Sequence, residues 1–181
     1  MTGGPFVDAV PAAHLAERLE TLVPGAVLET VLFRNEVTVV VPAALIVAAC
    51  RALKDDPESD CAMLTDVTSV HHLEGDFEHE VIYQLHSLEK NHRIRLKVKL
   101  RPGETIPSVT PVWKGANWLE REVFDLAGVR FSGHPDLRRI IMPDDYPDHP
   151  LRKDFDVEGG PTSIDMPGRP ASPGFRDMDH A

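Results

Sequence analysis

The chain has 181 residues and a net charge of −10, with 42% apolar and 27% charged residues, which is the composition of one globular domain with its own core. The acidic balance disfavours nucleic acid as a partner, because that partner needs a surplus of Lys and Arg on one face. The longest apolar stretch, residues 39–50, is shorter than the roughly 20 residues of a membrane span. The N-terminus lacks the pattern of a signal peptide, so a cytoplasmic setting is expected.

Cofactor sites are not indicated by the residue inventory. Cys50 and Cys61 are the only cysteines and form no C-x-x-C pair, whereas an iron–sulfur cluster or a structural zinc ion usually takes about four ligands. Glycine-rich loops that bind nucleotide phosphates are also missing. His72, His79 and His86 lie too far apart to meet within one strand. We therefore expect no cluster, flavin, nicotinamide or metal on this chain.

The first 101 residues alternate between helical and strand patterns, which predicts an α+β fold with a mixed or antiparallel sheet and helices packed on it. The predicted elements are a helix over 11–22, a β-hairpin over 27–33 and 36–41, a helix over 43–54 and a buried strand over 61–70. A turn at Arg34 and Asn35 pairs Leu32 with Val37 and gives the hairpin one largely apolar face.

A second hairpin is predicted where apolar and basic residues alternate strictly over 93–101. A turn at Lys90 and Asn91 would pair Leu96 with Leu85 and place all apolar side chains on one face. The opposite face then carries a basic stripe, formed by Arg93, Arg95, Lys97, Lys99 and Arg101. We interpret the stripe as a solvated face balanced by nearby glutamates, with binding of phosphate or of an acidic partner as the alternative.

A third helix is predicted from Pro111 to the residue before Gly128. Its second half carries the charged residues Glu120, Arg121, Glu122 and Asp125. Arg121 and Asp125 are spaced as an ion pair one turn apart. Two carboxylates on one face could act as general acid and base, but an arginine between them is more typical of a structural ion-pair network.

The remaining chain, residues 131–181, is rich in Pro, Asp and Gly. We expect it to be an extended arm that follows a domain formed by residues 1–130. Apolar residues and arginines up to about residue 155 favour contact with a neighbouring protein, with packing on the chain's own domain as the alternative. The part beyond is expected to be flexible. Residues 1–130 should then fold without the arm.

Three segments together resemble one known family. They are WLEREVFDLAGV at 118–129, GHPDLRRI at 133–140 and HPLRKDF at 149–155. This long, ordered pattern resembles the C subunit of the proton-pumping NADH–quinone oxidoreductase, respiratory complex I.

The resemblance implies a non-redox core subunit of the peripheral arm, on the cytoplasmic side of the cell membrane and attached to the membrane only through the complex. That enzyme passes electrons from NADH through FMN and iron–sulfur clusters to quinone and couples this to proton translocation, and the cofactors belong to other subunits. The expected partners are the D subunit and the B-subunit side of the quinone-reducing module. No residue is expected to be catalytic. Scaffold and interface roles are expected for Glu120, Arg121, Glu122, Asp125, His134, Arg138, Arg139, His149 and Arg152.

Two alternatives remain open from the sequence. One is the equivalent subunit of a related membrane-bound hydrogenase or formate hydrogenlyase complex. The other is a stand-alone enzyme that uses the carboxylates of Glu120, Glu122 and Asp125.

Overall fold

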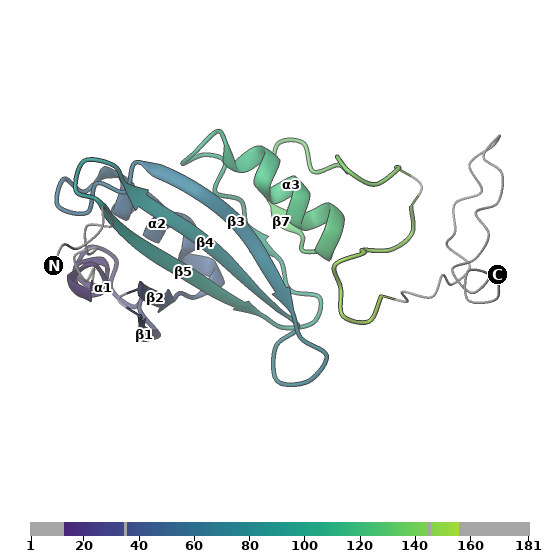
Figure 1. Ribbon diagram of the computed structural model, residues 1–181, viewed down its shortest axis with the longest axis horizontal. Helices are drawn as coiled ribbons and strands as arrows, with labels where there is room; N and C mark the ends of the chain where they lie inside the picture. Colours follow the sequence, from purple (N-terminus) through teal and green to yellow (C-terminus); the bar gives the residue numbers. More distant parts are fainter. Residues whose placement is uncertain (1–12, 35, 145, 156–181) are drawn as a thin grey trace, which may run out of the picture.

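The computed structural model describes residues 13–34, 36–144 and 146–155 (Figure 1). The elements in chain order are α1 (Ala13–Leu22), β1 (Glu29–Phe33), β2 (Glu36–Val40), the 3₁₀ turn η1 (Ala43–Leu45), α2 (Ile46–Asp55), β3 (Met63–His71), β4 (His79–Ser87), β5 (His92–Leu100), β6 (Ile106–Pro107), α3 (Ala116–Ala127) and β7 (Phe131–Ser132). Five strands form one sheet in the order β1-β2-β5-β4-β3. Only the β2–β5 pair in this sheet is parallel, so the predicted α+β fold with a mixed sheet is confirmed.

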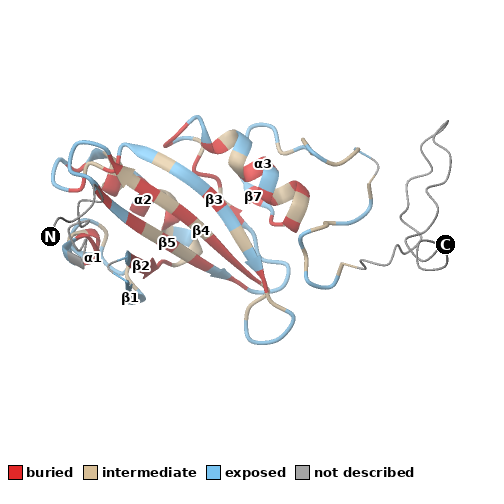
Figure 2. Ribbon diagram, in the orientation of Figure 1, coloured by how far each residue is buried: buried red, intermediate tan, exposed pale blue. Residues whose placement is uncertain are grey.

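The core lies between the sheet and the helices α1 and α2, and α2 is seen behind the sheet in the view of Figure 1. Alternate residues of β5 face this core, and Ile94, Leu96 and Val98 are at most 1% exposed (Figure 2). The fully buried ring of Tyr83 lies beside them on β4. This period-two burial is what the strict alternation in the sequence predicts for a sheet with one face covered.

The register predicted for the first hairpin is confirmed, but its apolar face is only half buried. Leu32 pairs with Val37, and Thr30 pairs with Val39. Both of these valines are buried, whereas every residue of β1 is exposed and Leu32 is 56% exposed. The reason is that β1 is the edge strand of the sheet, so it has a neighbour on one side only.

The predicted register of the second hairpin is wrong by two residues, although its faces are right. The structure pairs Leu96 with Tyr83 and Leu85 with Ile94. The loop between β4 and β5 has four residues, Leu88–Asn91, instead of the two-residue turn expected at Lys90 and Asn91. A shift of two residues leaves every side chain on its predicted face, so alternation alone could not reveal the error.

The segment 61–70 does form a strand, but the expectation that it is buried is wrong. Along β3 only Val67 and His71 are buried. As the other edge strand, β3 has a hydrogen-bonded neighbour on one side only, and α3 packs beside it (Figure 1). Cys61, which precedes the strand, is fully buried.

The first two predicted helices are confirmed within the described residues. Leu15 and Leu19 of α1 are fully buried, and residues 11 and 12 of the predicted helix lie outside the described part. Helix α2 follows η1 and buries Ile46, Ala49 and Leu53, the residues expected on its core side. None of the helices in the described ranges is long and apolar enough to cross a membrane.

Candidate functional site

Helix α3 is the scaffold of the candidate site, and it is shorter than predicted. The expected start at Pro111 is wrong, because residues 109–115 form turns in which the Val112 N–H donates to the carbonyl of Val109, and the helix begins at Ala116. Gly128 ends the helix as predicted, with a left-handed φ of 84°. A Cβ atom at this glycine would lie 2.8 Å from Cδ2 of His149, so both the backbone conformation and the arm packed above it require glycine.

Asp125 is the centre of the site. Its side chain is fully buried, and its Oδ2 accepts hydrogen bonds from three successive backbone N–H groups, those of Ile140 (2.9 Å), Ile141 (2.7 Å) and Met142 (3.0 Å). Arg139 donates from Nη1 to Oδ1 at 2.7 Å. Burial alone would raise the pKa of Asp125, but these donors outweigh it and hold the pKa below its ordinary value. The carboxylate therefore fixes the course of residues 139–142.

Arg139 and His149 extend the same hydrogen-bond network to residues 146–149 of the arm. The Arg139 guanidinium also donates to the backbone carbonyls of Asp125 (3.1 Å), Tyr146 (2.7 Å) and Asp148 (3.1 Å). Nδ1 of His149 lies 2.8 Å from the Asp125 carbonyl oxygen, within hydrogen-bond distance. These bonds tie residues 139–149 to the C-terminal half of α3.

The predicted ion pair between Arg121 and Asp125 is wrong. Arg121 instead donates from Nε to the carbonyl of Arg138 (3.0 Å) and from Nη2 to that of Arg139 (3.2 Å). Its guanidinium also lies over the ring of Trp118, 5.0 Å from the centroid. The arginine therefore binds carbonyl groups of the same loop whose N–H groups Asp125 binds.

Glu120 anchors the other side of α3. It is fully buried, and its carboxylate accepts hydrogen bonds from Ser108 Oγ (2.6 Å) and from the Val109 N–H (2.7 Å). Nε2 of His134 lies 3.9 Å from Oε2 and 3.2 Å from the Asn117 carbonyl oxygen. Burial raises the pKa of Glu120 to about 7, against the two hydrogen bonds, which lower it.

This shift predicts a pH-dependent stability. A carboxyl group whose pKa is about 7 when folded and 4.5 when unfolded binds more protons in the folded state. Its contribution is present in full below about pH 4.5 and is lost as the pH rises through 7, amounting to roughly 3 kcal/mol. We expect Glu120→Gln to flatten the decline in unfolding free energy between about pH 5 and 8, measured by urea unfolding. An equal decline in both proteins would contradict the assignment to Glu120.

Two predicted site residues have side chains that face solvent. Glu122 is exposed and makes no side-chain hydrogen bond with any residue in the described ranges. Arg138 has a 71% exposed side chain that pairs with Asp136 at 3.0 Å, and only its carbonyl takes part in the network around α3. These two side chains are accessible to another molecule.

Arg152 lies apart from this network, at a cluster that was not predicted from the sequence. It pairs with Glu78 at 2.9 Å, and the neighbouring Lys153 N–H donates to Nδ1 of His71 at 3.0 Å. His71 pairs with His79 across β3 and β4, and both rings come within 4.8 Å of Glu78. The signal available in the sequence was the pairing of these two histidines across a hairpin, which distances along a single strand do not reveal.

The donor set of this cluster fits the arm better than it fits a metal ion. Because His71 Nδ1 accepts the Lys153 N–H, the ring hydrogen lies on Nε2, the atom that faces Glu78 at 3.8 Å and that a metal would need unprotonated. The Arg152 guanidinium already binds the Glu78 carboxylate. Burial lowers the pKa of His79 to about 4, so this ring is neutral. The prediction that no metal binds here stays a prediction.

The course of the arm differs from the sequence-based expectation. Phe131 is 3% exposed, and it belongs to β7, which pairs with β6. The boundary placed after Arg130 therefore cuts through a strand pair and removes a core residue. The arginines of the arm bind the carbonyls and carboxylates of their own chain as far as Arg152, and the predicted flexible end, 156–181, lies outside the described residues.

Comparisons with known proteins identify the family. Residues 39–161 match the family model described as "Respiratory-chain NADH dehydrogenase, 30 Kd subunit". Over 136 residues the chain is 47% identical to the C subunit of the NADH-quinone oxidoreductase of Geotalea uraniireducens. The aligned residues cover 75% of this chain and 82% of that relative. The chain is 43% identical over 145 residues to that of Caulobacter vibrioides (80% and 73% covered) and 43% identical over 144 residues to that of Geobacter sulfurreducens (78% and 88% covered). This chain therefore belongs to the 30 kDa subunit family of the respiratory-chain NADH dehydrogenase.

Proposed function

We propose that this chain is a non-redox scaffold subunit in the peripheral arm of an NADH–quinone oxidoreductase that couples electron transfer to proton translocation. It supports the quinone-reducing module, with the D subunit as its main partner and the B subunit nearby, on the cytoplasmic side of the cell membrane. FMN and the iron–sulfur clusters belong to other subunits, and no residue of this chain is catalytic.

The observation that carries the proposal is that the buried charged residues on α3 bind the backbone of their own chain. Glu120, Arg121 and Asp125 are buried, and each binds backbone groups of the same chain. A general acid or base must reach a substrate proton, but these groups are enclosed by the loops that they hold. Arg121 and Asp125 are placed to fix the shape of the segment 138–149, and Glu120 holds the loop at residues 108–109. Holding loops in place is the role of a scaffold.

The outer surface of α3 and the arm exposes large apolar side chains that a partner protein can bind. Trp118 is 62% exposed, Ile141 57% and Leu151 63%. All three are carried by α3 or by the arm. The Ile141 N–H donates to Asp125, and the Leu151 N–H donates to the carbonyl of Leu126 at 2.8 Å, so the backbone of the arm is held at both positions. Large apolar side chains on a rigid backbone commonly dominate protein–protein binding, because little conformational entropy is lost when they dock. This supports a partner contact at α3 and the arm.

The two cysteines support the assignment of the clusters to other subunits. Both are fully buried. Burial raises the pKa of Cys61 to about 12 and that of Cys50 even further. Because iron and zinc bind the thiolate, such thiols are poor ligands.

Purification of a tagged copy from its own cells tests the proposal. We expect the wild-type chain to retain the other oxidoreductase subunits, D and B among them, and to carry no flavin or iron once it is separated from them. The double variant Ile141→Lys/Leu151→Lys should lower retention of the D subunit at least about tenfold, since losing two anchors costs about 2 kcal/mol or more. The matched control is Leu32→Lys, an equally exposed leucine on the opposite sheet edge, which should leave that retention unchanged.

Other outcomes would assign the chain differently. Co-purification with hydrogenase subunits in place of D and B would indicate the related membrane-bound complex. Substrate turnover by the isolated chain that is lost in Glu122→Gln would favour a carboxylate enzyme. Unchanged retention of the D subunit by the double variant would place the interface elsewhere.

A further inference from the structure

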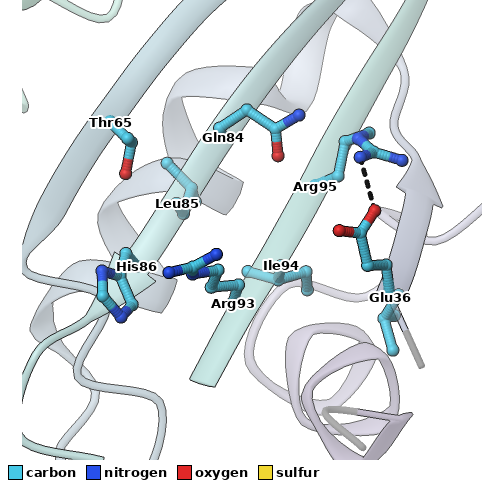
Figure 3. Close-up of a pocket in the computed structure, with 9 residues that line it drawn as sticks. Glu36, Thr65, Gln84, Leu85, His86, Arg93, Ile94 and Arg95 are labelled. Atoms are coloured by element: carbon cyan, nitrogen blue, oxygen red, sulfur yellow. Dashed lines mark hydrogen bonds and ion pairs between the residues drawn. The ribbon is translucent and has the colours of Figure 1, made fainter. Parts of the chain in front are cut away.

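The outer face of the sheet, which helices α1 and α2 leave open, contains a hollow of about 320 Å³ near the β4–β5 turn (Figure 3). Residues of β3, β4 and β5 and the first two residues of β2 line it. The polar ones are Glu36, Thr65, Gln84, His86, Arg93 and Arg95. Nothing in the proposed scaffold role uses this hollow, which lies at the end of the sheet away from the arm (Figure 1).

The basic stripe crosses this face, and its charges are unevenly balanced. Arg95 pairs with Glu36 at 2.8 Å (Figure 3), Lys97 with Glu80 at 2.9 Å, and Lys99 with the edge-strand residue Glu29 at 3.5 Å. Arg93 is exposed and has no carboxylate within ion-pair distance in the part of the chain that the structure describes. In a chain with a net charge of −10, a lone guanidinium at the mouth of a hollow is a specific feature of this face.

A second unpaired group lies directly across the strands from Arg93. His86 pairs with Arg93 in the β4–β5 register and also lines the hollow. Its Nε2 is shielded from solvent and has no hydrogen-bond partner among the described residues. A guanidinium fork next to an imidazole N–H matches the two oxygens of one carboxylate, since each oxygen accepts from its own donor.

We propose that the hollow receives a carboxylate side chain from an acidic segment of a neighbouring subunit, held by Arg93 and, after a small shift of the arginine side chain, by His86. This rests on the proposed function, because the neighbour is another subunit of the complex. The chain's own acidic end is the less direct source. The described part of the chain ends with the arm, which lies beyond α3 on the side of the molecule opposite the β4–β5 turn (Figure 1). The interface is thus a second one, separate from the arm.

Zero-length cross-linking of the purified complex tests this contact. Arg93→Lys places an amine in the hollow, and a water-soluble carbodiimide joins an amine to a touching carboxylate as an amide, the carbodiimide taking up the water that is lost. We expect mass spectrometry to find an amide from position 93 to an Asp or Glu of another subunit. Arg101→Lys is the matched control, because Arg101 is exposed, lies outside the hollow and has no ion pair within the described ranges. The Lys97–Glu80 pair, 2.9 Å apart, is the internal positive control.

The outcomes separate the two proposals. No link from position 93 while the Lys97–Glu80 link forms would overturn the inference, and so would a link to residues 156–181 of the same chain. If no other subunit co-purifies with the wild-type chain, the proposed function fails and the inference fails with it. As a second readout, Arg93→Glu should lower retention of this chain in the complex about tenfold in moderate salt, and Arg101→Glu less than about twofold.

Discussion

Replacing Asp125 with alanine should lower the free energy of unfolding by about 3–5 kcal/mol, because it strands a largely buried guanidinium and three backbone donors. The Arg139 side chain is only 12% exposed, and the N–H groups of residues 140–142 share the single oxygen Oδ2. Urea unfolding of the isolated chain measures the change. Glu122→Ala is the matched control, since it removes an exposed carboxylate from the same helix and should change stability by less than about 0.5 kcal/mol.

Asp125→Asn gives a sharper form of the same experiment. An amide keeps one oxygen for the three N–H groups, but its NH₂ then faces the Arg139 guanidinium, which donates to Oδ1 at 2.7 Å in the wild-type chain. We expect a loss between those of the control and the alanine variant. If both Asp125 variants unfold like the wild type, the network does not hold the fold, and the catalytic interpretation of these carboxylates regains weight.

The sequence predicted correctly which side chains of the sheet face the core, because burial alone determines the alternation of apolar and polar residues. Alternation placed the side chains of β5 on their correct faces, and the turn expected at Arg34 and Asn35 led to the right register between β1 and β2. It could not fix the pairing of β4 with β5, because shifts of two residues bury the same face. It also could not tell an edge strand from a central one, which is why β3 was expected to be buried.

The hydrogen-bond partners of the charged residues on α3 are distant in sequence. The spacing of residues along the helix therefore did not predict them. An ion pair one helical turn apart contributes only about 0.3–0.5 kcal/mol. Asp125 instead binds three backbone donors and an arginine from 14 to 17 residues away, and Arg121 binds carbonyls 17 and 18 residues away. The resemblance to a family identified these residues as important, but only the folded loop shows what each one binds.

Truncation after Arg130 should destabilise the chain strongly, contrary to the expectation that residues 1–130 fold without the arm. The fragment loses Phe131, which is 3% exposed and whose burial contributes roughly 1.5–3 kcal/mol. It also loses every hydrogen-bond donor to the Asp125 side chain found in the described ranges, and charge-assisted bonds contribute about 1.5–3 kcal/mol each. A loss of about 5 kcal/mol or more would lower the thermal midpoint by roughly 10–20 °C relative to the full chain.

A second fragment, truncated after Pro135, separates the two causes. It keeps Phe131 and the β6–β7 pair but lacks the loop that binds Asp125. If both contributions matter, its thermal midpoint should fall between those of the shorter fragment and the full chain. A 1–130 fragment that melts cooperatively at the midpoint of the full chain would show that the arm is an independent appendage. An intermediate melt for the longer fragment would instead establish residues 131–149 as part of the domain, so that partner binding acts on a surface already shaped by α3.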